Sequence, residues 1–181
     1  MAGTARGRRL RSPEGQGTRP TSDRVREAVF NALTSAGSVR DAAVADLFAG
    51  SGALGIEALS RGAAHCWFVE ADAAARAVID DNLDTLGLRG RATVVTGELP
   101  DAVTGLPDQL DLVLADPPYA FDRWDGLLAS LAPKLAGDAV VVVESDRSVA
   151  VPAGWEKQRE RSYGGTVITF TAPPSGTGDD A

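Results

Sequence analysis

The stretch DLFAGSGALG, residues 46–55, decides the fold, because its three glycines join a short apolar run to a helical pattern. Gly50, Gly52 and Gly55 satisfy G-x-G-x-x-G, a turn in which the backbone can approach a ligand closely and helix N–H groups can face negative charge. Asp46 precedes this turn in a strand that pyrophosphate-binding folds usually keep apolar. Its carboxylate favours a ligand with an ammonium group, although a tight turn without any ligand would need the same glycines.

Strand and helix patterns alternate on both sides of this turn. A capped helix is predicted from residue 21, with apolar positions at helical spacing up to Leu33. Further helices are predicted over 53–61, 72–86 and 124–135, the last closed by Gly137, and a short one near Pro100. Strands are predicted over 42–48, 65–71, 92–96, 110–115 and 139–144, and the segments 154–163 and 166–172 are predicted to form a hairpin across Gly164 and Gly165.

This order predicts an α/β fold that is Rossmann-like, with a seven-stranded, mostly parallel sheet, helices on both faces and a C-terminal antiparallel hairpin. Residues 1–20 are predicted as a basic N-terminal arm or hairpin, 21–172 as the single domain and 173–181 as a disordered tail. In open sheets of this kind the ligand lies over the carboxyl ends of the strands. The candidate site residues should therefore gather at that edge.

The charge of the chain is distributed unevenly. The net charge is -7, yet residues 1–40 hold eight arginines and only three acidic residues. The planar guanidinium favours bidentate contacts with phosphate, so a nucleic acid would meet this segment and not the acidic remainder. A solvated leader is the alternative interpretation of the same run.

Cysteine and histidine occur once each, as Cys66 and His65. One cysteine cannot form an internal disulfide, and a His/Cys metal site needs more ligands, so we expect no metal. No run of about eighteen apolar residues occurs, and no apolar segment follows the arginines near the N-terminus. We therefore expect a cytoplasmic protein without a membrane span.

Acidic residues follow the second and third predicted strands. Glu70 ends the second strand twenty residues after Gly50, where a carboxylate can accept hydrogen bonds from both ribose hydroxyls. Asp72 is expected to cap the next helix. Glu98 follows the third strand and either reaches an adenine edge or is simply solvated. The glycine turn and Glu70 together fit an adenosine-containing cofactor of any type.

The sequence ADPPYAFD, residues 115–122, ends the fourth strand beside the same edge. Pro117 and Pro118 have no backbone N–H and fix a rigid corner whose carbonyls face outward. The Asp116 carboxylate and the Pro117 carbonyl can accept hydrogen bonds from an exocyclic amine and stabilise positive charge that develops on it. Tyr119 can stack on the base and hold it in line. The alternative is a proline-terminated strand with Asp116 as the N-cap of the next helix.

Four stretches resemble one family of enzymes: RPTSDRVREAVFNAL at 19–33, DLFAGSGALGIEALSRGA at 46–63, FVEAD at 68–72 and LVLADPPY at 112–119. They are similar to the RsmD family of bacterial 16S ribosomal RNA guanine-N2 methyltransferases, within the class I S-adenosylmethionine-dependent methyltransferases. The glycine turn and D-P-P-Y are shared with many amino-methyltransferases, whereas the stretch at 19–33 is particular to this family. ES at 144–145 and YGGT at 163–166 also resemble it.

The resemblance implies that S-adenosyl-L-methionine is the cofactor and that 16S rRNA, within a small ribosomal subunit particle, is the substrate. The implied cofactor-binding residues are Asp46, Phe48, Ala49, Gly50, Ser51, Gly52, Glu70, Ala71, Glu98 and Asp116. Asp116, Pro117, Pro118 and Tyr119 would hold the target guanine outside its stack. The implied RNA-binding residues are Arg6, Arg8, Arg9, Arg11, Arg19, Thr21, Arg24 and Arg26. We expect a monomer without a metal ion.

Three other functions remain open at this point. A DNA or RNA adenine-N6 methyltransferase would share the glycine turn and D-P-P-Y, although the DNA enzymes usually carry a target-recognition insert for which this chain has no room. An NAD-dependent oxidoreductase would explain the glycine turn and Glu70 but leaves Asp46 and D-P-P-Y without a role. A non-catalytic RNA-binding module would not need Asp116 and Tyr119. Only the resemblance selects N2 of guanine over N6 of adenine.

Overall fold

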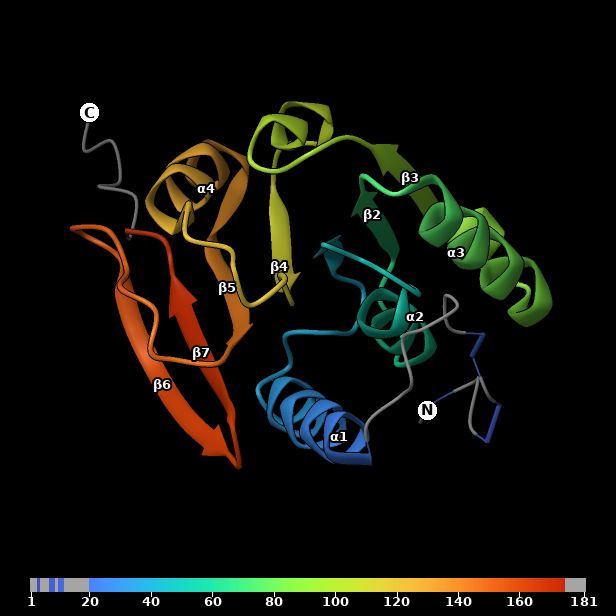
Figure 1. Ribbon diagram of the computed structural model, residues 1–181, viewed down its shortest axis with the longest axis horizontal. Helices are drawn as coiled ribbons and strands as arrows, with labels where there is room; N and C mark the ends of the chain where they lie inside the picture. Colours follow the sequence, from blue (N-terminus) through green and yellow to red (C-terminus); the bar gives the residue numbers. More distant parts are fainter. Residues whose placement is uncertain (1–2, 4–6, 9, 12–19, 175–181) are drawn as a thin grey trace.

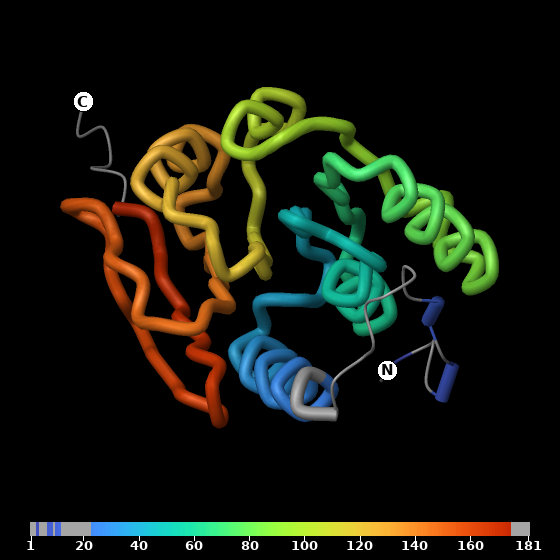
Figure 2. Tube along the Cα trace, in the orientation of Figure 1, coloured from blue at the N-terminus to red at the C-terminus, as the bar shows by residue number. Residues whose placement is uncertain are grey.

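A seven-stranded sheet forms the middle layer of the protein (Figure 1). The computed structural model describes residues 3, 7–8, 10–11 and 20–174. The strands are β1 Ala43–Leu47, β2 His65–Glu70, β3 Ala92–Thr96, β4 Leu110–Ala115, β5 Leu135–Ser145, β6 Glu156–Tyr163 and β7 Thr166–Ala172. They lie in the order β3-β2-β1-β4-β5-β7-β6, so that β3 and the β6–β7 hairpin form opposite edges (Figure 2).

The five strands from β3 to β5 in this order are parallel, whereas β7 pairs antiparallel with both β5 and β6. Their parallel direction brings the carboxyl ends of β1, β2, β3, β4 and β5 to one edge of the sheet. The predicted fold class, including the C-terminal hairpin, is therefore confirmed.

Helices cover both faces of the sheet. They are α1 Pro20–Ser35, α2 Ala53–Ser60, α3 Ala73–Leu86 and α4 Trp124–Leu131, with the short 3-10 helices η2 Arg89–Arg91, η3 Asp101–Gly105 and η4 Ala132–Lys134. The first three helices pack into one buried cluster with Leu112 and Leu114, and η3 and α4 pack into a second cluster with Val113 and Ala115. Successive residues of β4 thus point to opposite faces, as the pleat of a strand requires.

Gly55 allows α2 to pack directly on β2. A Cβ at this position would lie 2.4 Å from Phe68 Cε1 and 2.6 Å from Cys66 Sγ, which is too close for any side chain. The last glycine of the turn therefore serves the packing of helix on strand. Cys66 is buried in this contact, as expected for a small residue with a structural role.

The helix predicted over 124–135 ends earlier than the sequence suggested. α4 ends at Leu131, η4 follows it, and β5 already begins at Leu135, so the prediction that Gly137 closes a helix is wrong. Pro133 lacks the backbone N–H that a continuing α-helix would need, and Leu135 pairs with Leu110 of β4. Gly137 is consequently an exposed residue within a strand.

Candidate active site

The glycine turn lies at the carboxyl end of β1 and leads into α2. Phe48, Gly50 and Gly52 have positive φ angles of 59°, 55° and 77°, a conformation that costs free energy at Phe48, because it carries a Cβ. The Gly52 N–H donates to the Ala49 carbonyl at 2.7 Å. An added Cβ on Gly50 would meet only a backbone oxygen at 3.9 Å, so this part of the turn is open to a ligand.

Asp46 lies buried in β1 and holds the start of α2 through a hydrogen bond with Gly55. Its side chain is only 1% exposed, and its Oδ2 accepts a hydrogen bond from the Gly55 N–H at 2.8 Å. Burial raises the pKa of Asp46 well above its ordinary value, and the nearby Asp116 and Glu70 carboxylates raise it further. One oxygen of this carboxyl group therefore anchors the first turn of α2 to β1, which leaves the other for the expected contact with an ammonium group.

Glu70 links the glycine turn to the end of β2. Its Oε2 accepts a hydrogen bond from the Gly50 N–H and its Oε1 accepts one from the Asp72 N–H, each at 2.8 Å. Asp72 caps α3 by accepting from the Ala75 N–H at 2.7 Å, as predicted. Glu70 thus lies against the turn, where the sequence predicts a ribose, and each oxygen keeps a lone pair for a hydroxyl.

The other predicted cofactor residues surround this turn. Ala49 is buried, Ser51 is half-buried, and both Ala71 and Glu98 are exposed beside the ends of β2 and β3. The Ser51 carbonyl accepts a hydrogen bond from Asn82 Nδ2 of α3 at 3.0 Å. The sequence predictions placed all of these residues near one edge of the sheet, and the parallel register brings them together there.

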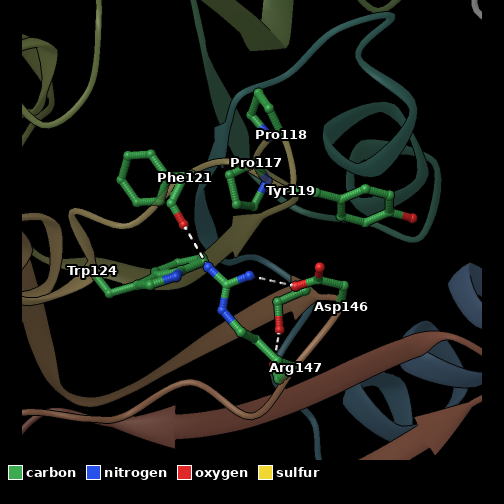
Figure 3. A pocket seen from close by; sticks show the side chains of 8 residues that line it. Pro117, Pro118, Tyr119, Phe121, Trp124, Asp146 and Arg147 are labelled. Carbon is green, nitrogen blue, oxygen red and sulfur yellow. Dashed lines mark hydrogen bonds and ion pairs between the residues drawn. The ribbon is translucent and has the colours of Figure 1, made fainter.

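The loop after β4 forms one wall of a pocket. Pro117, Pro118, Tyr119, Phe121 and Trp124 line it from this side (Figure 3). Tyr119 is 52% exposed, the only large apolar side chain so exposed among the described residues. α4 begins at Trp124 with Arg123 as its N-cap, so the alternative that Asp116 caps this helix is wrong.

Aromatic contacts join this loop to the glycine turn. The Phe121 ring lies 5.0 Å from the Phe48 ring and 5.0 Å from the Trp124 ring, in edge-to-face arrangements. The Phe121 N–H also donates to the Pro118 carbonyl at 2.8 Å, which closes a tight turn. The glycine turn and the loop after β4, which the sequence predicted at the same edge of the sheet, therefore contact each other directly.

The opposite wall of the pocket comes from the end of β5 and was not predicted. It consists of Ser145, Asp146 and Arg147 (Figure 3). Arg147 ties the two walls together, since it donates to the Phe121 carbonyl at 3.4 Å and pairs with Asp146 at 3.0 Å. Ser145 belongs to the ES dipeptide that resembles the family, but no motif marks Asp146 and Arg147, and the pairing of β5 with β4 brings all three to the site.

Four acidic residues form a row along this edge, each on or directly after one of the neighbouring strands β2, β1, β4 and β5: Glu70, Asp46, Asp116 and Glu144. We call them the acidic row. All four share the face of the sheet covered by α1–α3, because their strand neighbours two residues earlier belong to that core cluster. Burial raises the pKa of Asp116 to about 6, although part of the residue reaches solvent. Burial and the neighbouring Asp116 raise the pKa of Glu144 to about 7, against an opposing effect of Arg26.

The predicted RNA-binding arginines differ in their exposure and in the partners they bind. Arg8 donates to the Thr85 carbonyl at 3.2 Å, and Arg11 pairs with Asp81 at 2.9 Å, so both lie on α3. Arg24 is exposed on α1, whereas Arg26 is only 16% exposed and pairs with Asp23 at 2.7 Å. Arg6, Arg9, Arg19 and the side chain of Thr21 lie outside the described residues.

Asn82 fastens the N-terminal segment to the core. It is only 3% exposed; its Oδ1 accepts from the Arg11 N–H at 2.9 Å, and its Nδ2 donates to the Arg11 carbonyl at 3.1 Å. The same amide group reaches the Ser51 carbonyl of the glycine turn. A side chain that no motif marks therefore connects the basic segment with the turn.

The strand order, the glycine turn and the loop after β4 define a class I methyltransferase fold. Precorrin-6y C5,15-methyltransferase from Geobacter metallireducens shares this fold, with a TM-score of 0.65 at 19% identity over 90% of this chain and 92% of the other. The solved structure of yhhF from Escherichia coli matches more closely, with a TM-score of 0.84 at 37% identity over 97% of each chain.

Sequence relatives identify the family within this class. The family model described as Conserved hypothetical protein 95 matches residues 1–172. The Ribosomal RNA small subunit methyltransferase D of Escherichia coli is 39% identical over 91% of this chain and 84% of its own length, and YlbH of Bacillus subtilis is 38% identical over 94% and 96%. The chain belongs to this family, and the resemblance to RsmD methyltransferases is confirmed.

No described helix has the length and apolar character that a membrane crossing requires. Within the described residues, no three His, Cys, Asp or Glu side chains are grouped as metal ligands would be.

Proposed function

We propose that this chain uses S-adenosyl-L-methionine to methylate N2 of a guanine in 16S rRNA of the small ribosomal subunit. Methylation of rRNA is the activity in the names of its relatives in Escherichia coli and Haemophilus influenzae, both called Ribosomal RNA small subunit methyltransferase D. The observation that carries the proposal is the juxtaposition of Asp116–Tyr119 with the glycine turn through the contact of Phe121 and Phe48.

The residues of the turn fit this cofactor. Gly50 leaves an open approach to the backbone, and Glu70 lies beside it as an acceptor for ribose hydroxyls. The Asp46 oxygen that does not bond Gly55 can accept a hydrogen bond from an amino-acid ammonium group. Carboxylates along the acidic row favour a ligand that carries positive charge at this edge.

The cofactor, when bound, supplies an electrophilic methyl group on a sulfonium whose departure leaves a neutral thioether. Asp116 and the Pro117 carbonyl accept hydrogen bonds from the exocyclic N–H groups, which keeps the nitrogen lone pair directed at the methyl group. Asp116, with a pKa of about 6, is ionised at neutral pH and can then accept the proton that the nitrogen loses.

A target base must leave its stack to reach Asp116 and Tyr119, which lie exposed at the carboxyl edge of the sheet. RNA recognition then depends on shape and on splayed bases. The chain is acidic beyond residue 40, so the exposed arginines near α1 are the expected phosphate contacts. We infer that the substrate is an assembled particle and that the chain acts in the cytoplasm, as a monomer and without a metal ion.

Replacing Asp116 by alanine tests the proposal. We expect the variant to lose methyl transfer to small-subunit particles from cells that lack the enzyme, while its affinity for S-adenosylhomocysteine in calorimetry stays within about threefold. Asp122→Ala is the matched control, since Asp122 is an exposed carboxylate of the same loop. Loss of cofactor affinity in the Asp116 variant would instead place this residue in the cofactor half of the site.

Nucleoside analysis of the wild-type product identifies the reaction. N2-methylguanosine supports the proposal, and N6-methyladenosine supports the adenine alternative. Thermal stabilisation by NAD but not by S-adenosylhomocysteine would support the oxidoreductase alternative. Binding of particles without any methyl incorporation would support the non-catalytic module.

A further inference from the structure

Asp116 and Glu144 occupy neighbouring positions at the ends of adjacent strands. Ala115 of β4 pairs in parallel with Val143 of β5, so the next residue of each strand is an acid. Leu114 and Val142, two residues earlier, belong to the same core cluster. Because side chains two apart share a face, the Asp116 and Glu144 carboxyls lie on the same side of the sheet.

Asp116 is exposed and Glu144 is half-buried, and neither carboxyl is paired with a protein donor among the described residues. Burial and then the Asp116 carboxylate raise the pKa of Glu144, and Arg26 of α1 opposes this effect. Arg26 itself pairs with Asp23. Within residues 20–174, no hydrogen bond is made to the carboxyl oxygens of Asp116 or Glu144. A ligand with two neighbouring N–H donors would supply what both groups lack.

Asp116 and Glu144 each adjoin in sequence one wall of the pocket, and Tyr119 close to Asp116 is exposed. Pro117–Tyr119 line one wall and Ser145–Arg147 line the other, and Asp116 and Glu144 are the residues that directly precede these walls. A base that stacks on Tyr119 would lie close to Asp116, and the register of β4 and β5 places Glu144 beside Asp116.

The Watson–Crick edge of guanine has the required donors side by side, N1–H and N2–H₂. Adenine has an N6–H₂ donor next to N1, which is an acceptor and would face a carboxylate unfavourably. Two adjacent carboxylates therefore distinguish guanine from adenine, whereas D-P-P-Y alone accepts either exocyclic amine.

We propose that Glu144 is a specificity-determining residue, whose carboxylate accepts the N1–H of the target guanine while Asp116 accepts an N2–H. This inference rests on the proposed function and deepens it, because it says why the enzyme would choose guanine. It concerns selection of the base, and the methyl transfer itself still depends on Asp116.

The test replaces the N1–H donor of the target guanine by a hydrogen-bond acceptor. The methylated nucleotide is first mapped in small-subunit particles, and 16S rRNA with 2-aminopurine at that position is then assembled into particles. 2-Aminopurine keeps the exocyclic amine at the same place but has an acceptor at N1. We expect the wild type to methylate guanine about tenfold or more faster than 2-aminopurine, because the Glu144 carboxylate would face a lone pair.

Glu144→Gln should lower the ratio of the guanine rate to the 2-aminopurine rate, or reverse the preference, since its amide N–H can donate to N1 of 2-aminopurine. Asp138→Asn is the matched control, an exposed carboxylate at the opposite end of the same strand, and should keep the wild-type ratio. A structural role for Glu144 would lower both rates together and leave their ratio unchanged, which would overturn the inference.

The outcomes separate the two proposals. Absence of N2-methylguanosine in the wild-type product refutes the proposed function. If the wild type forms N2-methylguanosine but methylates 2-aminopurine equally fast, only the role of Glu144 is refuted, and this result requires no variant to fold. S-adenosylhomocysteine binding by Glu144→Gln confirms that its cofactor site is intact.

Discussion

Replacing Glu144 by glutamine should stabilise the fold at alkaline pH. The folded state raises the pKa of this carboxyl from its ordinary 4.5 to about 7, mainly through burial and then through the adjacent Asp116. A folded-state pKa above the unfolded value means that stability is complete below pH 4.5 and is lost as the pH rises to about 7. Glutamine keeps the size of the side chain and has no charge to bury.

The magnitude follows from the two pKa values. Each pH unit between them corresponds to about 1.4 kcal/mol, so the ionised Glu144 costs at most about 3–4 kcal/mol of folding free energy. Partial exposure and relaxation around Arg26 reduce this value, and we expect about 1–2 kcal/mol above about pH 8. Removal of the Glu144 charge also lowers the cost of ionising the adjacent Asp116, which stabilises the variant further at alkaline pH.

Urea unfolding between about pH 5.5 and pH 8.5 measures this effect. The free energy of unfolding of Glu144→Gln should exceed that of the wild type by an amount that grows with pH, whereas Asp138→Asn should differ by about 0.5 kcal/mol or less throughout. The raised pKa of Glu144 is refuted if the variant exceeds the wild type by the same free energy of unfolding at both ends of this range. It is also refuted if the variant is less stable than the wild type at the alkaline end.

Three further predictions concern packing, anchoring and pH. Gly55→Ala should lower the free energy of unfolding by about 1–3 kcal/mol in urea, because its Cβ would lie 2.4 Å from Phe68 Cε1; an unchanged midpoint would contradict this packing. Asn82→Ala should cost about 1–3 kcal/mol through its lost buried hydrogen bonds, and Asp81→Ala, which breaks only an exposed ion pair, should cost about 0–1 kcal/mol. Equal losses in the two variants would mean that the buried hydrogen bonds of Asn82 add no stability. Methyl transfer should fall about tenfold per pH unit below about pH 6, as Asp116 becomes protonated, and a flat rate profile down to about pH 5 would remove this carboxylate from the mechanism.

The sequence predicted the order of the elements well, because glycines and apolar periodicity act locally. The glycine turn, Glu70 and D-P-P-Y were recognisable because each combines a chemical group with the end of a predicted strand. The error at 124–135 has the same local origin: Gly137 resembled a helix stop, but Pro133 and the pairing of Leu135 with β4 end the helix first.

ES at 144–145 resembled the family, but no role for Glu144 or for Asn82 could be assigned from sequence, because both roles depend on partners far along the chain. Glu144 meets Asp116 only through the register of β4 and β5, and Asn82 contacts both Arg11 and Ser51. Asp46 was recognised as unusual for its strand, but its hydrogen bond to the Gly55 N–H required the structure. Tertiary contacts of this kind leave no periodic pattern in the sequence.

The acidic row has a consequence for the balance of charge during turnover. Under the proposed reaction, the positive charge supplied by the cofactor would pass with the methyl group to the guanine nitrogen, which would then release it as a proton. Asp116 and Glu144, with pKa values of about 6 and 7, can retain that proton in the same place. The net charge of the pocket then stays constant through methyl transfer, and no ion has to enter or leave while the RNA still covers it.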